Sequence, residues 1–153
     1  MQRIRQAQYE ALKAANTELV SLYWDLGRLI VDKQSGATWG KEVVKRLSQD
    51  LQSEFPGIRG FSPQNLWKMR GFYEAYAESE KLSPLVRELG WSHNMVIFHA
   101  CKDSLQREFY IRMTRKFGWS KNVLVHQIDN RSYEKTLTGQ TNFDKAVTPA
   151  QRT

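Results

Sequence analysis

The tripeptide glycine–aromatic–serine occurs three times in this chain, each time directly before a helical pattern of apolar residues. The copies are Gly60-Phe61-Ser62, Gly90-Trp91-Ser92 and Gly118-Trp119-Ser120. A serine at this position accepts a hydrogen bond from a first-turn amide that has no partner within the helix. The aromatic residue can also pack on an apolar residue five positions later, here Leu66, Val96 and Leu124. The sequence therefore predicts capped helix starts at Ser62, Ser92 and Ser120.

Composition indicates a folded, basic protein. The 153 residues fit one domain, and 41% hydrophobic with 12% aromatic residues is typical of a globule and not of a disordered tail. The 23 Lys and Arg outnumber the 16 Asp and Glu, which gives a net charge of +7. Such a balance favours a polyanionic partner, most commonly nucleic acid, although it also occurs in basic proteins without one.

Cysteine content and hydropathy indicate the compartment. Cys101 is the single cysteine, which excludes an internal disulfide and a cysteine-based zinc site and fits a reducing cytoplasm. The first residues lack the unbroken apolar core of a signal peptide, and no stretch approaches the length of a membrane span. We therefore expect a soluble, cytoplasmic protein without membrane association.

A regular apolar stripe predicts one long helix, from about Arg5 to Gln34, ended by residues 34–37. Its members alternate steps of three and four: Leu12, Ala15, Leu19, Leu22, Leu26 and Leu29. Gly27 lies where a neighbouring main chain can approach closely. The stripe fits either the spine of the domain's own core or a dimer seam. We expect the core and leave oligomerisation open.

The rest of the pattern predicts an all-α, multi-helical fold. Helices over 39–55 and 63–76 resemble a helix-turn-helix unit, although the loop from Pro56 to Phe61 is longer than the tight turn of the minimal motif. Further helices are expected from Ser92, over 105–117 and over 119–135. Residues 137–153 contain Gly, Thr and Pro without an apolar period. We expect a helical domain over 1–136 and a linker or edge segment over 137–153.

The helix over 63–76 carries a candidate interface. Helical geometry gives it an inner face with Leu66, Met69, Tyr73 and Tyr76 and an outer face with Gln64, Trp67, Lys68 and Gly71, with Arg59 and Arg70 at its margins. An amide side chain can read a base edge and a cation can contact a phosphate. A tryptophan on this face indicates stacking on a base, contact with a sugar or burial under a protein, but it equally fits the domain's own core.

A second basic cluster follows Lys102. If Phe109, Tyr110, Met113 and Phe117 face inward, then Arg112, Arg115 and Lys116 share one flank, opposed there only by Glu108. Such stripes bind phosphates without reading sequence, and ordinary solvated helices show the same pattern.

Nothing in the sequence indicates catalysis. His93, His99 and His126 lack the spacing of helical metal ligands, no acidic cluster accompanies them, and no glycine-rich phosphate loop occurs. Nowhere does an acid stand two positions before a lysine, the pairing that restriction-type nucleases use around Mg²⁺. We therefore expect no catalytic residues, no metal and no cofactor.

Several longer strings resemble a known family. YWDLGRLIVDKQ, WGKEVVKRLSQDLQSEFPGIRGFSPQNLWKMRGFYEAY, GWSHNMVIF, REFYIRMTRKFGWSKNVLVHQI and TNF look like the N-terminal domain of the bacterial YhcG-like proteins, predicted nucleases of the PD-(D/E)xK superfamily. The resemblance implies a helix-turn-helix-like DNA-binding domain that precedes a nuclease domain. It also implies a signature helix with Ser62, Asn65, Leu66, Trp67, Met69, Arg70, Phe72 and Tyr73. The chain stops soon after Pro149, so we expect a separated or truncated N-terminal domain that does not cleave DNA.

These observations favour a DNA-binding module that targets or regulates a nuclease domain. The expected contact residues are Arg59, Gln64, Asn65, Trp67, Lys68, Arg70, Arg112, Arg115 and Lys116. Gln64 and Asn65 are the candidates near bases. The alternative is a protein-interaction or dimerisation module, in which the leucine stripe and Trp67 bury against a second copy or another protein. RNA binding or an antitoxin-like role is a third possibility.

Overall fold

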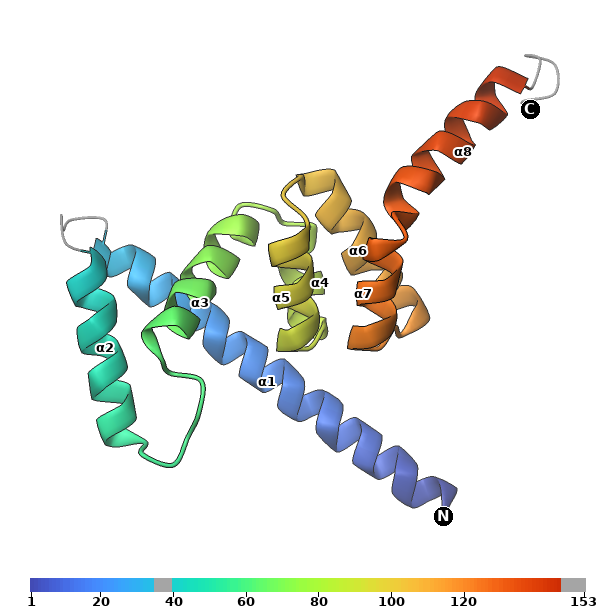
Figure 1. The fold of residues 1–153 in the computed structure, drawn as a ribbon. Helices are drawn as coiled ribbons and strands as arrows, with labels where there is room; N and C mark the ends of the chain where they lie inside the picture. Colours follow the sequence, from blue (N-terminus) through green and yellow to red (C-terminus); the bar gives the residue numbers. More distant parts are fainter. Residues whose placement is uncertain (35–39, 147–153) are drawn as a thin grey trace. The chain divides into compact units, whose positions relative to one another are not determined.

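The computed structural model describes residues 1–34 and 40–146, with side chains as far as Gly139, and most of these residues lie in helices (Figure 1). The helices are α1 (Gln2–Gln34), α2 (Gly40–Glu54), α3 (Pro63–Tyr76), α4 (Leu82–Glu88), α5 (Trp91–Ala100), α6 (Ser104–Phe117), α7 (Lys121–Asp129) and α8 (Ser132–Ala146). No strand occurs in this part of the chain, which confirms the all-α prediction. None of these helices is both long and apolar enough to cross a lipid bilayer.

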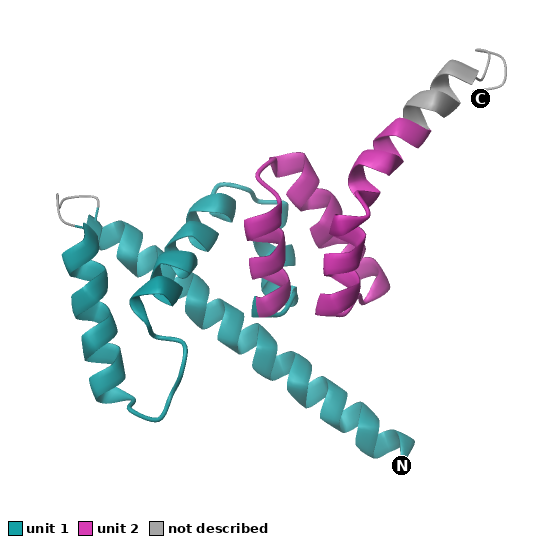
Figure 2. Ribbon diagram, viewed as in Figure 1, with its two compact units in different colours: residues 1–91 teal, residues 92–153 magenta. Residues whose placement is uncertain are grey.

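The chain divides into two compact units, Met1–Trp91 and Ser92–Thr153 (Figure 2). The sequence pointed to one helical domain over 1–136 and gave no indication of this division. The first helix was predicted to end over residues 34–37, and of these only Gln34 is among the described residues. Trp39, the predicted start of the second helix, also lies outside them.

The core of the first unit forms where α3 packs against α1 and α2. A cluster of buried side chains combines residues of α1, α2, α3 and the loop before α3: Tyr23, Ile30, Val44, Phe61, Leu66 and Met69. The hydroxyl of Ser48 in α2 donates a hydrogen bond to the carbonyl oxygen of Phe61 at 2.7 Å. This bond holds the loop beside α2 and so positions the start of α3.

The buried face of α1 is not the predicted leucine stripe. Val20, Tyr23, Trp24, Gly27 and Ile30 are buried instead. The aromatic rings of this face bury more apolar area than leucines do, and its glycine lets the main chain of α3 approach, so α3 packs here.

The expectation that the leucine stripe forms the domain's own core is therefore wrong. The exposed fractions of its side chains are 62% for Leu12, 40% for Leu19, 44% for Leu22 and 39% for Leu29. Ala15 is also exposed, and only Leu26 packs partly against the core cluster.

Two of the three predicted serine caps are confirmed. The side chain of Ser62 accepts a hydrogen bond from the amide of Asn65, and that of Ser120 accepts one from the amide of Val123, each at 3.2 Å. The prediction for Ser92 is wrong, because α5 already begins at Trp91. The ring of Trp91 packs edge-on against Tyr23 and Phe72, with ring centroids 4.8 and 5.2 Å apart, and this packing accompanies the earlier helix start.

The second unit has its own buried residues. Ile97, Cys101, Tyr110, Ile111 and Leu124 are its buried apolar side chains. The guanidinium group of Arg107 donates hydrogen bonds to the carbonyl oxygens of Cys101, at 2.8 Å, and Phe98, at 3.2 Å. Arg107 thus satisfies carbonyl groups at the end of α5, which have no partner within the helix.

The C-terminal helices differ from the prediction in two ways. The single helix expected over 119–135 is divided into α7 and α8, because Arg131 adopts a left-handed conformation with φ of 57° between them. The irregular segment expected over 137–153 is helical as far as Ala146. Lys135 to Gly139 are all exposed, so this part of α8 has no buried face and hence no apolar period to identify it. Residues 147–153 lie outside the described residues.

Candidate nucleic-acid interface

The inner face of α3 largely matches the prediction, but the outer face is narrower. Leu66, Met69 and Tyr76 are buried as expected, Phe72 is buried with them, and Tyr73 is half-buried. Of the two candidates for base contact, Gln64 is exposed and Asn65 is half-buried. The open strip of α3 is consequently small.

Trp67 contributes to the protein's own core. Its half-buried ring packs against the core cluster of the first unit. The Arg70 guanidinium carbon lies 5.1 Å from the centroid of this ring and so covers part of it. Of the interpretations that the sequence left open for Trp67, the structure favours completion of the core.

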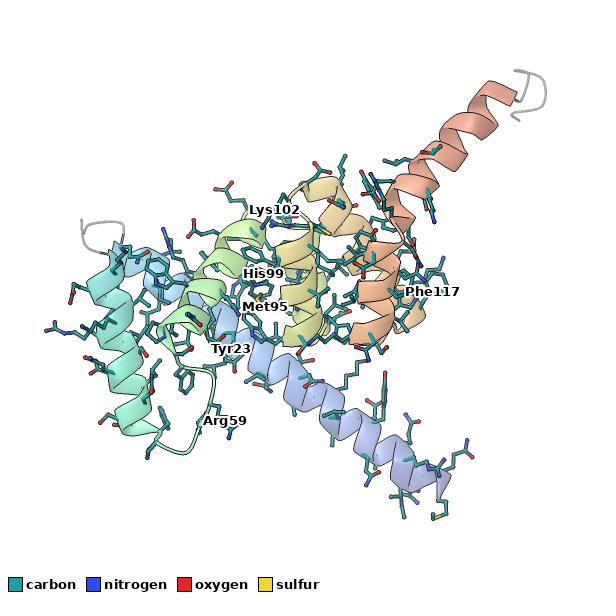
Figure 3. The ribbon with its side chains drawn as sticks, viewed as in Figure 1. Tyr23, Arg59, Met95, His99, Lys102 and Phe117 are labelled. Carbon is teal, nitrogen blue, oxygen red and sulfur yellow. The ribbon has the colours of Figure 1, made fainter. Side chains whose placement is uncertain are left out.

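The charge on the outer face of α3 is close to balanced. Arg70 is paired with Glu74, with Nε 2.8 Å from Oε1, and Lys68 is half-buried. Arg59 is exposed on the loop between α2 and α3 (Figure 3). This face therefore provides isolated cations and an exposed amide, and not a continuous positive surface.

The cations of α6 do lie together. Arg112, Arg115 and Lys116 are exposed, while Tyr110, Ile111 and Thr114 on the other side of the helix are buried. Arg112 is paired with Glu108, with Nε 3.1 Å from Oε2, and both side chains are partly exposed. An exposed pair of this kind contributes little to stability and is weakened by salt, so a phosphate can replace the carboxylate. The flank of α6 therefore presents positive charge to solvent.

An aromatic pair beside these cations was not predicted. Phe117 was expected to face inward, but its side chain is 59% exposed. It is the last residue of α6, and Gly118 follows in a left-handed conformation with φ of 62°. The chain turns there, so the apolar periodicity of the helix no longer places Phe117 against the core. The signal available in the sequence was Gly118 itself, a glycine between two aromatic residues at a helix end.

Phe117 and Trp119 stack on each other at this turn. Their ring centroids are 6.0 Å apart and their planes are inclined by 19°. The ammonium nitrogen of Lys116 lies 5.3 Å from the centroid of the Phe117 ring. The end of α6 thus places the exposed ring of Phe117, which is labelled in Figure 3, next to the positive charge of Lys116.

His93 and Cys101, two titratable residues of the second unit, have structural roles. His93 Nε2 is hydrogen-bonded to the carbonyl oxygen of Trp119 at 2.8 Å. Burial raises the pKa of the Cys101 thiol from 9.0 to about 11, although the nearby Arg107 opposes this shift. A thiol in this state is a poor nucleophile at neutral pH. Across the described residues, no group of three or more His, Cys, Asp and Glu side chains is arranged to hold a metal ion.

Comparison with known proteins gives a family match. The sequence model of the DUF1016 N-terminal domain matches residues 1–135. The protein named "Putative nuclease YhcG" from Escherichia coli (strain K12) is 29% identical over 163 aligned positions, which cover 86% of this chain and 43% of that protein. The chain thus corresponds to less than half the length of this relative. No solved structure matches the chain with significance.

Proposed function

We propose that this chain, which belongs to the DUF1016 N-terminal domain family, binds nucleic acid, and DNA in particular, so as to target or regulate a nuclease domain. The observation that carries the proposal is the exposed flank of α6, where Arg112, Arg115 and Lys116 lie together in a chain with a net charge of +7. The relative named as a nuclease extends well beyond the matched region, and that remainder has room for a separate catalytic domain. This chain would then supply affinity for the substrate of that domain.

The contacts expected from α6 are with phosphates. Lysine and arginine side chains that neutralise phosphates release condensed counterions, and this release favours binding to any sequence. The two arginines can also donate paired hydrogen bonds to phosphate oxygens. In the first unit, Lys68, Arg70 and Arg59 are candidates for additional phosphate contacts, and Gln64 and Asn65 are the candidates near base edges.

A purely structural role for these cations makes a different prediction. Arg115 and Lys116 lie in the last turn of α6, where positive charge interacts favourably with the helix dipole. If this were their function, their removal would lower stability by up to about 1 kcal/mol and leave nucleic-acid binding unchanged. The experiment therefore has to measure binding and stability on the same variants.

The proposal is tested by titrating labelled duplex DNA at several salt concentrations. We expect wild-type binding to weaken with salt, and Arg112→Ala and Lys116→Ala each to reduce the slope of log affinity against log salt by roughly 0.9. Lys45→Ala is the matched control, because Lys45 is an exposed cation that lies on α2 and not on the flank of α6. The salt slope of this variant should equal that of the wild type. Failure of the wild-type chain to bind any nucleic acid at low salt would refute the proposal.

A second candidate function is self-association through α1. The largely exposed leucine face places Leu12, Leu19 and the half-buried Leu26 seven residues apart, with Ala15, Leu22 and Leu29 as the second series. These two series occupy the a and d positions of a heptad, the pattern by which one helix packs against another copy of itself. Self-association and DNA binding are compatible, since a dimer would present two copies of the basic flank.

A further inference from the structure

The turn that ends α6 carries an aromatic surface that the protein covers only in part, since Phe117 is exposed and Trp119 is half-buried. This surface, the aromatic corner, consists of the side chains of Phe117 and Trp119 on either side of Gly118. The exposed ring of Phe117 lies nearly parallel to that of Trp119 and offers a flat face on which a further planar ring can stack. The contacts at this corner indicate which planar group fits it.

The main chain of the corner is held firmly in place. The amide of Trp119 donates to the carbonyl oxygen of Thr114 at 3.3 Å, and the carbonyl oxygen of Trp119 is hydrogen-bonded to His93 Nε2 at 2.8 Å. The amide of Gly118 also bonds to Thr114, which completes the left-handed end of the helix. Because the turn is already ordered, little conformational entropy is lost when a ligand binds to it.

The charge around the corner is positive. Lys116 lies next to the Phe117 ring, and the exposed Lys121 begins α7 two residues after Trp119. Arg112 is exposed one turn before Lys116 on the same side of α6. A nucleotide matches this arrangement, because it carries a planar base together with a negatively charged phosphate. The buried centre of a protein–protein interface is instead depleted of charged residues, so these cations argue against an apolar protein partner.

From this geometry we propose that the aromatic corner binds an unpaired base of single-stranded nucleic acid, with Lys116 and Arg112 contacting the adjoining phosphates. The faces of bases inside a duplex are occupied by their stacked neighbours, so a protein ring reaches only bases that are unpaired. Stacking on aromatic side chains is tolerant of sequence, because every base has a π-face. This inference rests on the proposed nucleic-acid binding and adds the strand type and the residues that select it.

The test compares a short single-stranded oligonucleotide with a duplex of the same sequence, by fluorescence anisotropy at several salt concentrations. We expect Phe117→Ala to weaken single-strand binding about tenfold, the loss of one stacked base, and to change duplex binding less than twofold. The salt slope should not change, because no charge is removed. Lys116→Ala should instead lower the single-strand slope by roughly 0.7.

Two further variants identify stacking as the cause. Phe117→Leu keeps an apolar side chain but removes the aromatic face, so it should weaken single-strand binding as Phe117→Ala does. Leu105→Ala is the matched control, because Leu105 is 65% exposed in the first turn of α6. This variant should bind the single strand with the affinity of the wild type. Thermal denaturation of each variant shows whether the fold is intact. We expect it to be intact, because the side chains of Phe117 and Leu105 are both exposed.

Each outcome separates this inference from the proposed function. If the wild type binds duplex DNA while Phe117→Ala and Phe117→Leu leave single-strand affinity unchanged, the aromatic corner is not a binding site and the proposed function stands. If Phe117→Leu retains wild-type affinity while Phe117→Ala loses it, the contact is apolar packing and the stacking inference is overturned. If neither strand type binds at low salt, both proposals fail.

Discussion

A methyl group on the α-carbon of Gly27 would lie 2.2 Å from the carbonyl oxygen of Met69 and 2.8 Å from its carbonyl carbon. The main chains of α1 and α3 are therefore in direct contact at this point, with no space for a side chain between them. This contact lies beside the core cluster that contains Met69 and Ile30. It explains why a glycine, which is unfavourable within a helix, occurs in the middle of α1.

Gly27→Ala should destabilise the first unit despite the higher helix propensity of alanine. The gain in propensity is about 1 kcal/mol, but forcing two packed helices apart usually costs about 1–3 kcal/mol and more when the obstacle is main chain. We expect a net loss of about 2 kcal/mol in the free energy of unfolding, measured by chemical denaturation followed by circular dichroism.

Gly139→Ala provides the matched control. Gly139 lies in α8, and an added methyl group there meets nothing within 4 Å. The same substitution should therefore leave stability unchanged or raise it slightly. Equal effects of the two variants would contradict the close approach of α1 and α3.

The three glycine–aromatic–serine tripeptides should differ in how much their serines stabilise the fold. Ser62→Ala and Ser120→Ala each remove the acceptor for an amide of the first turn, so each should lower the free energy of unfolding by about 1 kcal/mol. Ser92→Ala should change it by less than about 0.5 kcal/mol, because Ser92 is exposed and lies inside α5. A large effect at Ser92 would mean that Ser92 caps α5 and that the helix begins at His93, two residues later than the structure shows.

The elements that the sequence predicted well depend on local rules. Ser62 and Ser120 cap helices because the required acceptor and amides are three residues apart, and Pro63 occupies a position where its missing amide costs nothing. The exposed cations of α6 follow from helical spacing alone. Interactions of this short range are visible in one sequence without knowledge of the tertiary fold.

The elements that the sequence predicted badly depend on tertiary packing. Two apolar faces of α1 compete for burial, and only the position of α3 decides that the face with Trp24 is covered and the face with Leu22 is not. Similarly, helical periodicity placed Phe117 inward, whereas the left-handed turn at Gly118 leaves it exposed. For Trp67, helical periodicity fitted both an exposed binding role and a place in the core. Only the tertiary structure, in which its ring packs against the core cluster, distinguishes the two.

Self-association through the leucine face is tested by placing a charge on it. We expect the wild-type chain to form a dimer in sedimentation equilibrium and Leu22→Asp to be monomeric, because a carboxylate buried at the seam would be desolvated without a partner. Leu22 is exposed within the chain, so the fold of the variant should remain intact.

Ala14→Asp is the control for that experiment. Ala14 is also exposed on α1 but lies off the leucine face, so the variant adds the same charge and should remain dimeric. A monomeric wild type across the accessible concentration range would refute self-association and leave the DNA-binding proposal untouched.

The thiol of Cys101 reports on the integrity of the second unit. Because burial raises its pKa to about 11, almost none of it is thiolate at pH 8, and a thiol reagent should label the native protein slowly and the denatured protein at once. The folded state also keeps this proton at pH values where the unfolded state, with a pKa near 9.0, has lost it. The contribution of Cys101 to stability is therefore constant below pH 9 and decreases as the pH rises toward 11. Cys101→Ala should show a shallower loss of stability across this range, and rapid labelling of the native wild type at pH 8 would contradict burial of the thiol.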